Sequence, residues 1–238
     1  KKLKLSIMTT KNKILVVDAH SDDETFGCGG TIAHHVRNND KVFCISFTNG
    51  VGARFDNNKN EYEVKKRKAS ALKAQKILGF RWLEEYCADL PDNSLDTVSM
   101  LELIKIIEQA KKKIKPDIIY THSNTDLNVD HRKISEATIV AFRPQPGEDW
   151  KEIRFFEIPS STEYSDGLNF DDFKPNLFIN IKTTLKKKLT ALKAYSSELR
   201  DYPHPRSLKG IKVLAQHRGV QNGLEYAEAF KVVKKIVR

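Results

Sequence analysis

Residues 13–30 read KILVVDAHSDDETFGCGG, and the fold follows from this stretch. Residues 14–17 have the composition of a buried parallel strand, and the Gly- and Thr-rich segment after the acids predicts the start of a helix. The junction between the two holds one histidine and three carboxylates: His20, Asp22, Asp23 and Glu24. This polar cluster therefore stands at the carboxyl end of a strand, where open α/β sheets place their ligand crevice.

Two interpretations of this junction follow from its chemistry. Adjacent carboxylates repel one another unless a cation is present. A divalent metal held by one nitrogen and one carboxylate oxygen would relieve the repulsion and leave a neighbouring carboxylate free as a base. The alternative is a polar turn that caps the helix, with Asp22 or Asp23 as the N-cap residue.

A second polar cluster follows another short apolar strand, at residues 117–120. The loop after this strand closes at Asp130 and His131, where the apolar spacing predicts a second helix. Because strand-to-helix junctions of a parallel sheet share one edge, His131 can meet His20 and Asp23. Two histidines and one aspartate around an open position form the ligand set of a catalytic zinc. The alternative is that Asp130 and His131 only cap their helix.

The two motifs together resemble those of a known family. Residues 19–24 (AHSDDE), followed by residues 29–33 (GGTIA), are similar to the signature of zinc-dependent de-N-acetylases of the PIG-L/LmbE type, which usually have Pro where Ser21 stands. Residues 128–132 (NVDHR) resemble that family's second motif, usually His-Pro-Asp-His. The resemblance covers most of the chain from about Lys13 onward and includes residues 48–50, Arg67 and residues 227–230.

The resemblance implies a division of roles within the two motifs. His20, Asp23 and His131 match the metal ligands, for zinc or another divalent ion such as Fe²⁺. Asp22 matches the general base, which takes a proton from a water whose pKa the metal lowers towards ~7. Glu24 would orient a ligand from the second shell. The alternative for Glu24 is an ordinary first-turn acid favoured by the helix dipole.

Three further residues take their expected roles from the same resemblance. Asp130 would orient a neighbouring polar group or ligand. Arg67 matches a position that contacts substrate hydroxyl or phosphate groups, although its place in the basic run at residues 65–68 is also typical of a solvated helix face. Asn128 stands where the family usually has a histidine. An Asn donates a hydrogen bond to an oxyanion but cannot deliver a proton.

The departure at Asn128 leaves the proton donor open. Asp22, after it has accepted a proton, is one candidate, and the others are nearby histidines: His122, His204 and His217. His122 directly follows the second strand, so we expect it near the metal and the substrate. His204 lies in the Pro-flanked turn at residues 202–206, which is suited to covering a site. An ordinary hydrogen-bonded or surface role is the alternative for each of these histidines.

Composition indicates one soluble domain. The chain has 238 residues, 39% hydrophobic and 30% charged, which suffices for one sizeable core. We interpret residues 1–12 as a basic, flexible extension and residues 13–238 as a single domain. No apolar stretch approaches the ~20 residues that span a bilayer, no signal peptide opens the chain, and the three cysteines lack metal-ligand spacing. We therefore expect a cytoplasmic protein without a membrane span.

The order of elements predicts a Rossmann-like α/β fold with a mostly parallel, doubly wound sheet and helices on both faces. Strands are expected at residues 13–19, 42–47, 81–86 and 117–120, with helices near residues 25–38, 62–78 and 96–114 and after residue 130. The later part predicts strands at residues 153–158 and 177–181, a helix near residues 183–199, and a return of the chain end to the sheet.

The net charge of +10 raises a rival class, a basic Rossmann-like protein that binds nucleic acid or nucleotides. The lysine runs at residues 111–113 and 186–188 lie on helices with apolar opposite faces, which favours solvated faces, and no helix-turn-helix signal accompanies them. The glycines of residues 27–30 are a weak dinucleotide signal, since the acids before them would repel a pyrophosphate.

We therefore expect a metal-dependent hydrolase that removes the N-acetyl group from an N-acetylated amino sugar or sugar conjugate of the GlcNAc type and releases acetate. This substrate class comes from the resemblance, and the basic charge suits an anionic conjugate. An amidase acting on a different N-acyl conjugate is the alternative within the enzyme class. We expect no specific nucleic acid partner, and a homo-oligomer is compatible with the chain.

Overall fold

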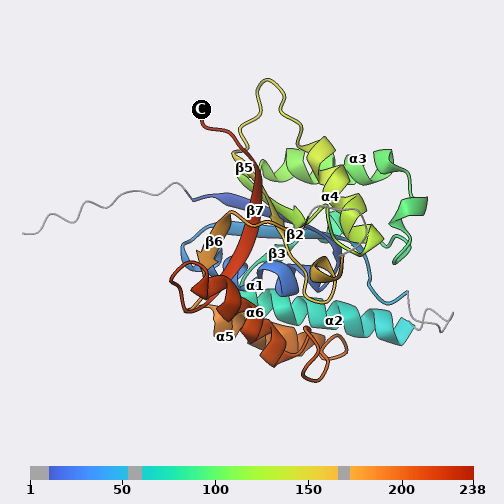
Figure 1. Cartoon of the computed structure of the whole chain (residues 1–238). Coiled ribbons are helices and arrows are strands. Elements are labelled where there is room, and N and C mark those ends of the chain that lie inside the picture. Colours follow the sequence, from blue (N-terminus) through green and yellow to red (C-terminus); the bar gives the residue numbers. More distant parts are fainter. Residues whose placement is uncertain (1–10, 53–60, 166–171) are drawn as a thin grey trace, which may run out of the picture.

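A computed structural model describes residues 11–52, 61–165 and 172–238, and the strands in these ranges form one sheet of seven in the order β3-β2-β1-β4-β5-β7-β6 (Figure 1). The strands β3, β2, β1, β4 and β5 are parallel, whereas β7 is antiparallel to both β5 and β6. Their bounds are β1 Lys13–His20, β2 Lys41–Thr48, β3 Arg81–Trp82, β4 Ile118–His122, β5 Glu152–Phe156, β6 Leu177–Asn180 and β7 Ala227–Lys235.

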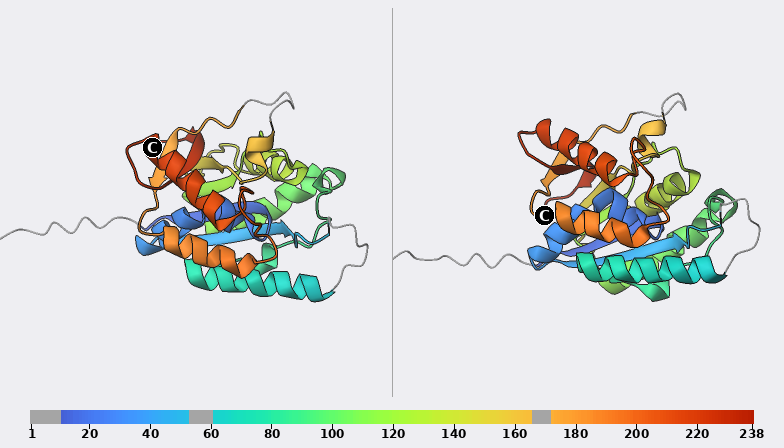
Figure 2. Two further views of the ribbon diagram at one scale, coloured as in Figure 1. Left: turned by 60° about the horizontal axis from the view of Figure 1, so that its bottom comes forward. Right: turned by 90° about the horizontal axis from the view of Figure 1, so that it is seen from below.

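Helices cover both faces of the sheet (Figures 1 and 2). Their bounds are α1 Asp23–Arg37, α2 Glu61–Leu78, α3 Met100–Ile114, α4 Val129–Ala141, α5 Leu185–Leu192 and α6 Leu208–Val220. One hydrophobic cluster joins the sheet to α1, α2, α5 and α6, and a second joins it to α3 and α4. The predicted doubly wound α/β fold is confirmed, with the antiparallel pairings of β7 as a departure at one edge.

The central strand β1 brings the two predicted clusters together. Seven of its eight residues are buried, and it pairs in parallel with β2 on one side and β4 on the other. This position explains its continuous apolar run, because both of its faces are covered by helices. The carboxyl ends of β1 and β4 are neighbours, with Val17 opposite Thr121. The loops that follow these strands therefore share one edge of the sheet.

Several predicted elements differ from the observed ones. The strand expected at residues 81–86 is only Arg81–Trp82, followed by a 3-10 helix at Glu84–Tyr86. The helix expected near residues 96–114 starts at Met100, and the one near residues 183–199 ends at Leu192 and continues as a 3-10 turn. The helix α6 was not predicted, because it buries few residues and only one of them is a large apolar side chain: Ile211, Ala215 and Gly219.

The glycines of residues 27–30 serve packing inside α1. A Cβ atom at Gly27 would lie 2.5 Å from the Phe156 ring, and one at Gly30 would lie 2.9 Å from the Ile181 side chain. Both positions therefore require glycine so that α1 can approach the sheet. This close packing accounts for the glycines without a dinucleotide.

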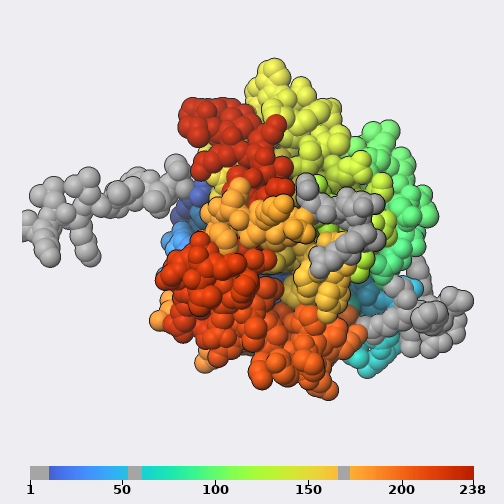
Figure 3. All heavy atoms as spheres, viewed as in Figure 1, coloured from blue at the N-terminus to red at the C-terminus, as the bar shows by residue number. Residues whose placement is uncertain are grey.

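The described part of the chain begins close to the first strand. Residues 1–10 of the predicted extension lie outside the described residues, and Asn12 already hydrogen-bonds with Lys41 and Asp40. The C-terminal part of the chain covers the left side of the surface in Figure 3: orange and orange-red segments lie below, and the dark red chain end lies above them. Among the described helices, none combines the length and apolar character needed to cross a membrane.

Candidate metal centre and active site

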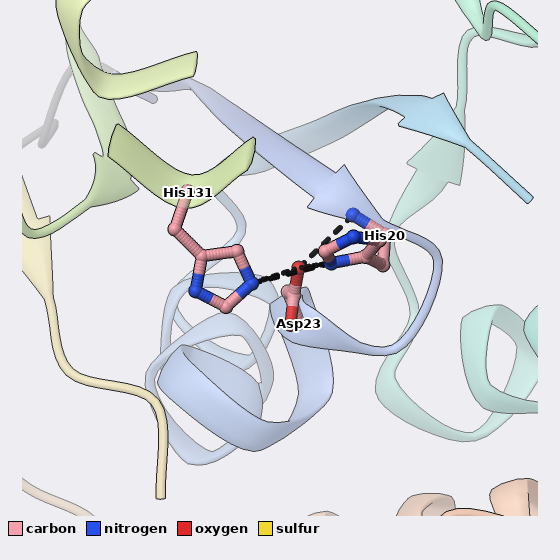
Figure 4. Close-up of side chains that lie close together, drawn as sticks. All are labelled: His20, Asp23 and His131. Atoms are coloured by element: carbon pink, nitrogen blue, oxygen red, sulfur yellow. Dashed lines mark hydrogen bonds and ion pairs between the residues drawn. The ribbon is translucent and has the colours of Figure 1, made fainter. Parts of the chain in front are cut away.

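Three side chains converge where β1 and the loop after β4 end (Figure 4). His20 is the last residue of β1, Asp23 opens α1, and His131 lies in the first turn of α4. The Asp23 Oδ2 atom is 3.0 Å from His20 Nδ1 and 3.3 Å from His131 Nε2. The two histidine nitrogens are 3.2 Å apart. The predicted ligand set is thus assembled from residues far apart in sequence, and all three side chains are buried.

The donor set fits a divalent metal. Two imidazole nitrogens and one carboxylate oxygen, all directed at one point beside a pocket, match a catalytic site that keeps a position open. The second carboxylate oxygen of Asp23, Oδ1, is buried and has no hydrogen-bond partner among the described residues. Such an atom is costly unless a nearby cation compensates it.

The electrostatics of the site favour a positive charge at the same point. Burial alone lowers the pKa of His131, but the carboxylates of Asp23 and Asp126 outweigh it and raise that pKa to about 9. The pKa of His20 is also raised, against the effect of burial and chiefly by Asp23. Burial raises the pKa of Asp23, but the charges of His131 and His20 hold it well below its usual range. The carboxylates that raise the pKa values of the two histidines would also attract a metal cation.

Asp126 orients His131 from behind. Its Oδ1 atom is 3.0 Å from His131 Nδ1, and its other oxygen accepts a hydrogen bond from Thr162 Oγ1 at 2.5 Å. Burial raises the pKa of Asp126, but His131 and the hydroxyl donors lower it to about 2. An ionised Asp126 favours a proton on Nδ1 of His131, so Nε2, which faces Asp23, is the nitrogen that would bind a metal.

Two carboxylates contact the Nε2 atom of His20, as Asp126 contacts the Nδ1 atom of His131. Its Nε2 atom lies 3.2 Å from Asp92 Oδ1 and 3.3 Å from Asp130 Oδ2. Asp130 is fully buried and accepts hydrogen bonds from the backbone N–H groups of Asn93 and Leu95, at 2.7 and 2.9 Å. Asp130 thus contacts Nε2 of His20, and Nδ1 of the same ring faces Asp23.

Asp22 lies beside the centre and pairs with Arg67. Arg67 Nη1 is 2.9 Å from Asp22 Oδ2, and Arg67 Nη2 is 2.6 Å from Glu198 Oε1 and donates to the Gly50 carbonyl at 3.0 Å. Only 4% of the Arg67 side chain is exposed, so its interpretation as part of a solvated helix face is wrong. The Arg67–Asp22 ion pair holds the Asp22 carboxylate next to His20, Asp23 and His131, and Asp22 is not part of that three-residue group.

A pocket of about 240 Å³ opens over this centre. It is lined by His20, Asp22, Asp23, Gly50, Arg67, Asp92, Asn93, Asn128, His131, Glu198, Arg200 and Arg206. Asn128 is also the N-cap of α4: its Oδ1 accepts from Asp130 N at 2.8 Å, and its Nδ2 donates to Asn93 Oδ1 at 2.9 Å. An amide has two N–H groups, so one donor of Asn128 stays available to the pocket.

Two predicted substrate-binding histidines lie outside the pocket lining. His122 is completely buried, its Nε2 accepts a hydrogen bond from Ala19 N at 2.9 Å, and its ring stacks on that of His131 at 3.9 Å. Burial and the charge of His131 hold the pKa of His122 well below its usual range. His204 accepts from Arg206 N at 3.0 Å. His122 therefore packs against the His131 ring, and His204 forms a hydrogen bond within its own loop.

Glu24 does not orient a ligand among the described contacts. It is fully buried and accepts a hydrogen bond from Tyr195 OH at 3.0 Å, and burial raises its pKa to about 8. Sequence reasoning missed six residues of the site: Asp92, Asn93, Asp126, Glu198, Arg200 and Arg206. Only Asp126 carried a signal, because it stands two residues before Asn128 in the same polar loop.

Comparisons with known proteins agree with this geometry. The PIG-L family, described as GlcNAc-PI de-N-acetylase, matches residues 15–142. An uncharacterized deacetylase of Escherichia coli K12, YaiS, is 27% identical over 209 residues, 83% of this chain and 99% of that protein. A probable N-acetyl-alpha-D-glucosaminyl L-malate deacetylase 2 of Bacillus anthracis is 22% identical over 80% of this chain and 83% of its own length.

A structural relative shows that this fold does not by itself identify the reaction. The crystal structure of a 4-carboxy-2-hydroxymuconate hydratase from Pseudomonas putida KT2440 superposes with a TM-score of 0.75 at 21% identity, over 95% of this chain and 98% of that one. Its reaction differs from deacetylation, so the shared architecture does not identify the chemistry. The family match spans more than half of the sequence and contains both site motifs, and the chain therefore belongs to the PIG-L family of GlcNAc-PI de-N-acetylases.

Proposed function

We propose that this protein is a metal-dependent hydrolase that removes the acetyl group from an N-acetylated amino sugar or sugar conjugate. The convergence of His20, Asp23 and His131 beside the carboxylate of Asp22, in a chain of the PIG-L family, carries the proposal. Zinc is the metal that two imidazoles and one carboxylate favour, and Fe²⁺ also binds such ligands. When bound, the metal supplies Lewis-acid chemistry: it acidifies water and polarises the amide carbonyl.

The residues around the ligands have separate tasks in this reaction. Asp22 takes the proton of the attacking water, and the Arg67 guanidinium at 2.9 Å holds the carboxylate in position. The free N–H of Asn128 donates to the oxygen that becomes negatively charged in the transition state. Because Asn128 carries no transferable proton and His122 is enclosed behind the ligands, the protonated Asp22 delivers the proton to the leaving amine.

An anionic conjugate suits the pocket. Arg200 and Arg206 line it together with Arg67, and in the described part of the chain Arg200 donates to the backbone carbonyls of Ser197 and Leu199 but forms no ion pair. A phosphate or carboxylate on the sugar would pair with the Arg200 and Arg206 guanidinium groups, since Arg67 is already paired with Asp22 and Glu198. The relative from Bacillus anthracis is named for a malate conjugate of an N-acetylated sugar, whose carboxylates are groups of this kind.

Metal analysis combined with acetate release tests the proposal. We expect about one divalent ion per chain, and acetate released from at least one member of a panel of N-acetylhexosamines, sugar nucleotides and malate or phosphate conjugates. The His131→Ala variant should lose the ion and the activity while it keeps its circular dichroism spectrum. Release of a longer acid from N-acyl analogues, without acetate from the acetyl forms, would favour the amidase alternative. A metal-loaded protein that hydrolyses no amide in the panel would refute the proposal.

A further inference from the structure

A second pocket, of about 280 Å³, lies between α2 and the edge of the sheet formed by β2 and β3. Arg67 lines both this pocket and the pocket over the metal ligands. The two pockets also meet at neighbouring residues: Ser21 lines the second pocket beside Asp22, and Asn49 lines it beside Gly50. The second pocket therefore continues the proposed active site beyond Arg67.

The surface that this second pocket offers is mainly carbon. Its apolar lining residues are Val64, Ala71, Leu72, Trp82, Cys87 and Ala88. The indole N–H of Trp82 donates to the Ala71 carbonyl at 3.3 Å, which fixes the ring as one wall. An aromatic wall with small aliphatic neighbours is the composition of a site for alkyl or aryl groups.

Several of the polar side chains that line the second pocket are already paired with protein groups. Asn49 Nδ2 donates to Asp89 Oδ1 at 2.6 Å, and Lys68 Nζ lies 3.7 Å from Glu84 Oε2. The hydroxyl of Ser46 donates to the Ala19 carbonyl at 3.3 Å. A polar ligand would have to break these contacts, whereas an apolar group leaves them intact.

The position of Arg67 decides which part of a substrate reaches the second pocket. Its ion pair with Asp22, in which each side chain is only 4% exposed, lies between the proposed metal ligands and the second pocket. The acyl group of the scissile amide is therefore excluded. A group attached to the outer part of the sugar conjugate can extend past Arg67. The volume is ample, since an apolar cavity of about 150 Å³ takes up benzene.

We propose that the second pocket binds an alkyl or aryl group carried by the sugar conjugate, so that the substrate is amphipathic. This inference rests on the proposed function for the identity of the substrate, but the pocket itself can be tested without hydrolysis. Phenyl β-D-glucoside has the aryl group and no amide. Trp82 lines the pocket, so its fluorescence reports binding.

The first measurement is a fluorescence titration of the protein with phenyl β-D-glucoside. We expect a saturable change in the wild type and a Kd at least about tenfold higher in Leu72→Asp, which places a charge in the pocket. Leu72 is 39% exposed, so the variant should fold. Leu101→Asp is the matched control, because Leu101 is 57% exposed on α3 and lies outside the pocket. Its Kd should equal that of the wild type.

The second measurement compares the deacetylation of methyl and phenyl N-acetyl-β-glucosaminides. A remote contact held equally in the ground and transition states lowers KM and leaves kcat unchanged. We expect a KM at least about tenfold lower for the phenyl glycoside, with the difference lost in Leu72→Asp only. Saturable binding of phenyl β-D-glucoside that Leu72→Asp weakens would support the pocket even if neither glycoside is hydrolysed, and the proposed function then fails only if no amide of the full substrate panel is hydrolysed. Absence of saturable binding, together with equal KM values, would overturn the pocket.

Discussion

We expect catalysis to depend most on Asp22, whose buried carboxylate lies beside the three proposed metal ligands and pairs with Arg67. Asp22→Asn keeps the shape and the contact with Arg67 but removes the basicity. We expect turnover to fall by roughly 10²-fold or more, the scale of positioned acid–base catalysis, with the metal retained. Metal content and single-turnover acetate release measure this. Asp96→Asn, at an exposed position, is the control, and near-normal turnover in Asp22→Asn would remove its role as base.

Asn128 combines two functions that different substitutions separate. Its Oδ1 caps α4, and its side chain also lines the pocket. Asn128→Ser keeps a capping oxygen and loses the amide donor, whereas Asn128→Ala loses both. We expect both variants to raise the barrier of the chemical step by roughly 3 kcal/mol, the loss of one oxyanion donor, and only Ala to lower stability, by about 1 kcal/mol. Full activity in the Ser variant would show that the amide does not approach the carbonyl.

His131 makes the metal-free protein sensitive to pH. Its pKa is about 9 in the folded state, against an ordinary value of 6.5. A pKa raised by folding contributes stability below pH 6.5, and this contribution is lost as the pH rises through about 9. The loss is of the order of 3 kcal/mol. Urea unfolding of the chelator-treated protein between pH 6 and pH 9.5 should show it, and metal-free His131→Gln should show a smaller decrease. Equal slopes in the two proteins would contradict the assignment.

At the scale of elements, α1 is broken at Cys28, and a buried ion pair caps both halves. Lys188 Nζ donates to the Phe26 carbonyl at 2.7 Å and pairs with Glu228 Oε1 at 2.6 Å. Glu228 accepts from the N–H of Gly30 at 2.9 Å and from the next residue. Lys188 is only 4% exposed, so the interpretation of residues 186–188 as a solvated face is wrong at its third lysine.

Removing one partner of this pair should destabilise the protein strongly. Lys188→Met leaves the Glu228 carboxylate buried without its cation, which we expect to cost about 3–5 kcal/mol in the free energy of unfolding. Lys187→Met, an exposed neighbour on the same helix, should stay within about 0.5 kcal/mol of the wild type. Urea denaturation compares the two. Similar midpoints for both variants would show that the Lys188–Glu228 ion pair does not stabilise the fold.

Elements are predictable from the sequence where a run of neighbouring apolar residues ends in a polar loop. The strand-to-helix junctions at His20 and His131 follow from apolar runs that end in polar loops, and the rule that parallel strands share an edge brings them together. The helix α6 lacked such a signal, since its buried face is small. Contacts such as Asp126 to His131, Arg67 to Glu198 and Lys188 to Glu228 depend on how separate loops and helices pack, which periodicity does not encode.

At the scale of the whole molecule, the net charge of +10 acts together with the arginines of the pocket. A positive field attracts an anionic substrate, and salt weakens this attraction because the screening length falls from about 10 Å at 0.1 M to about 3 Å at 1 M. A neutral N-acetylated sugar carries no net charge, so this field does not attract it. The proposed preference for anionic conjugates therefore predicts a salt dependence of KM that is specific to charged substrates.

Steady-state kinetics at rising ionic strength measure this prediction. Between 0.05 M and 0.5 M salt, we expect the KM of an anionic N-acetylglucosaminyl conjugate to rise several-fold, while that of methyl N-acetyl-β-glucosaminide stays constant and kcat is unchanged for both. Arg200→Gln should raise the KM of the anionic substrate at low salt and flatten its salt dependence, because Arg200 lines the pocket. Lys105→Gln removes the same charge from the exposed face of α3 and should have little effect. If the two variants behave alike, the attraction comes from net charge alone, and the pocket arginines do not select the anion.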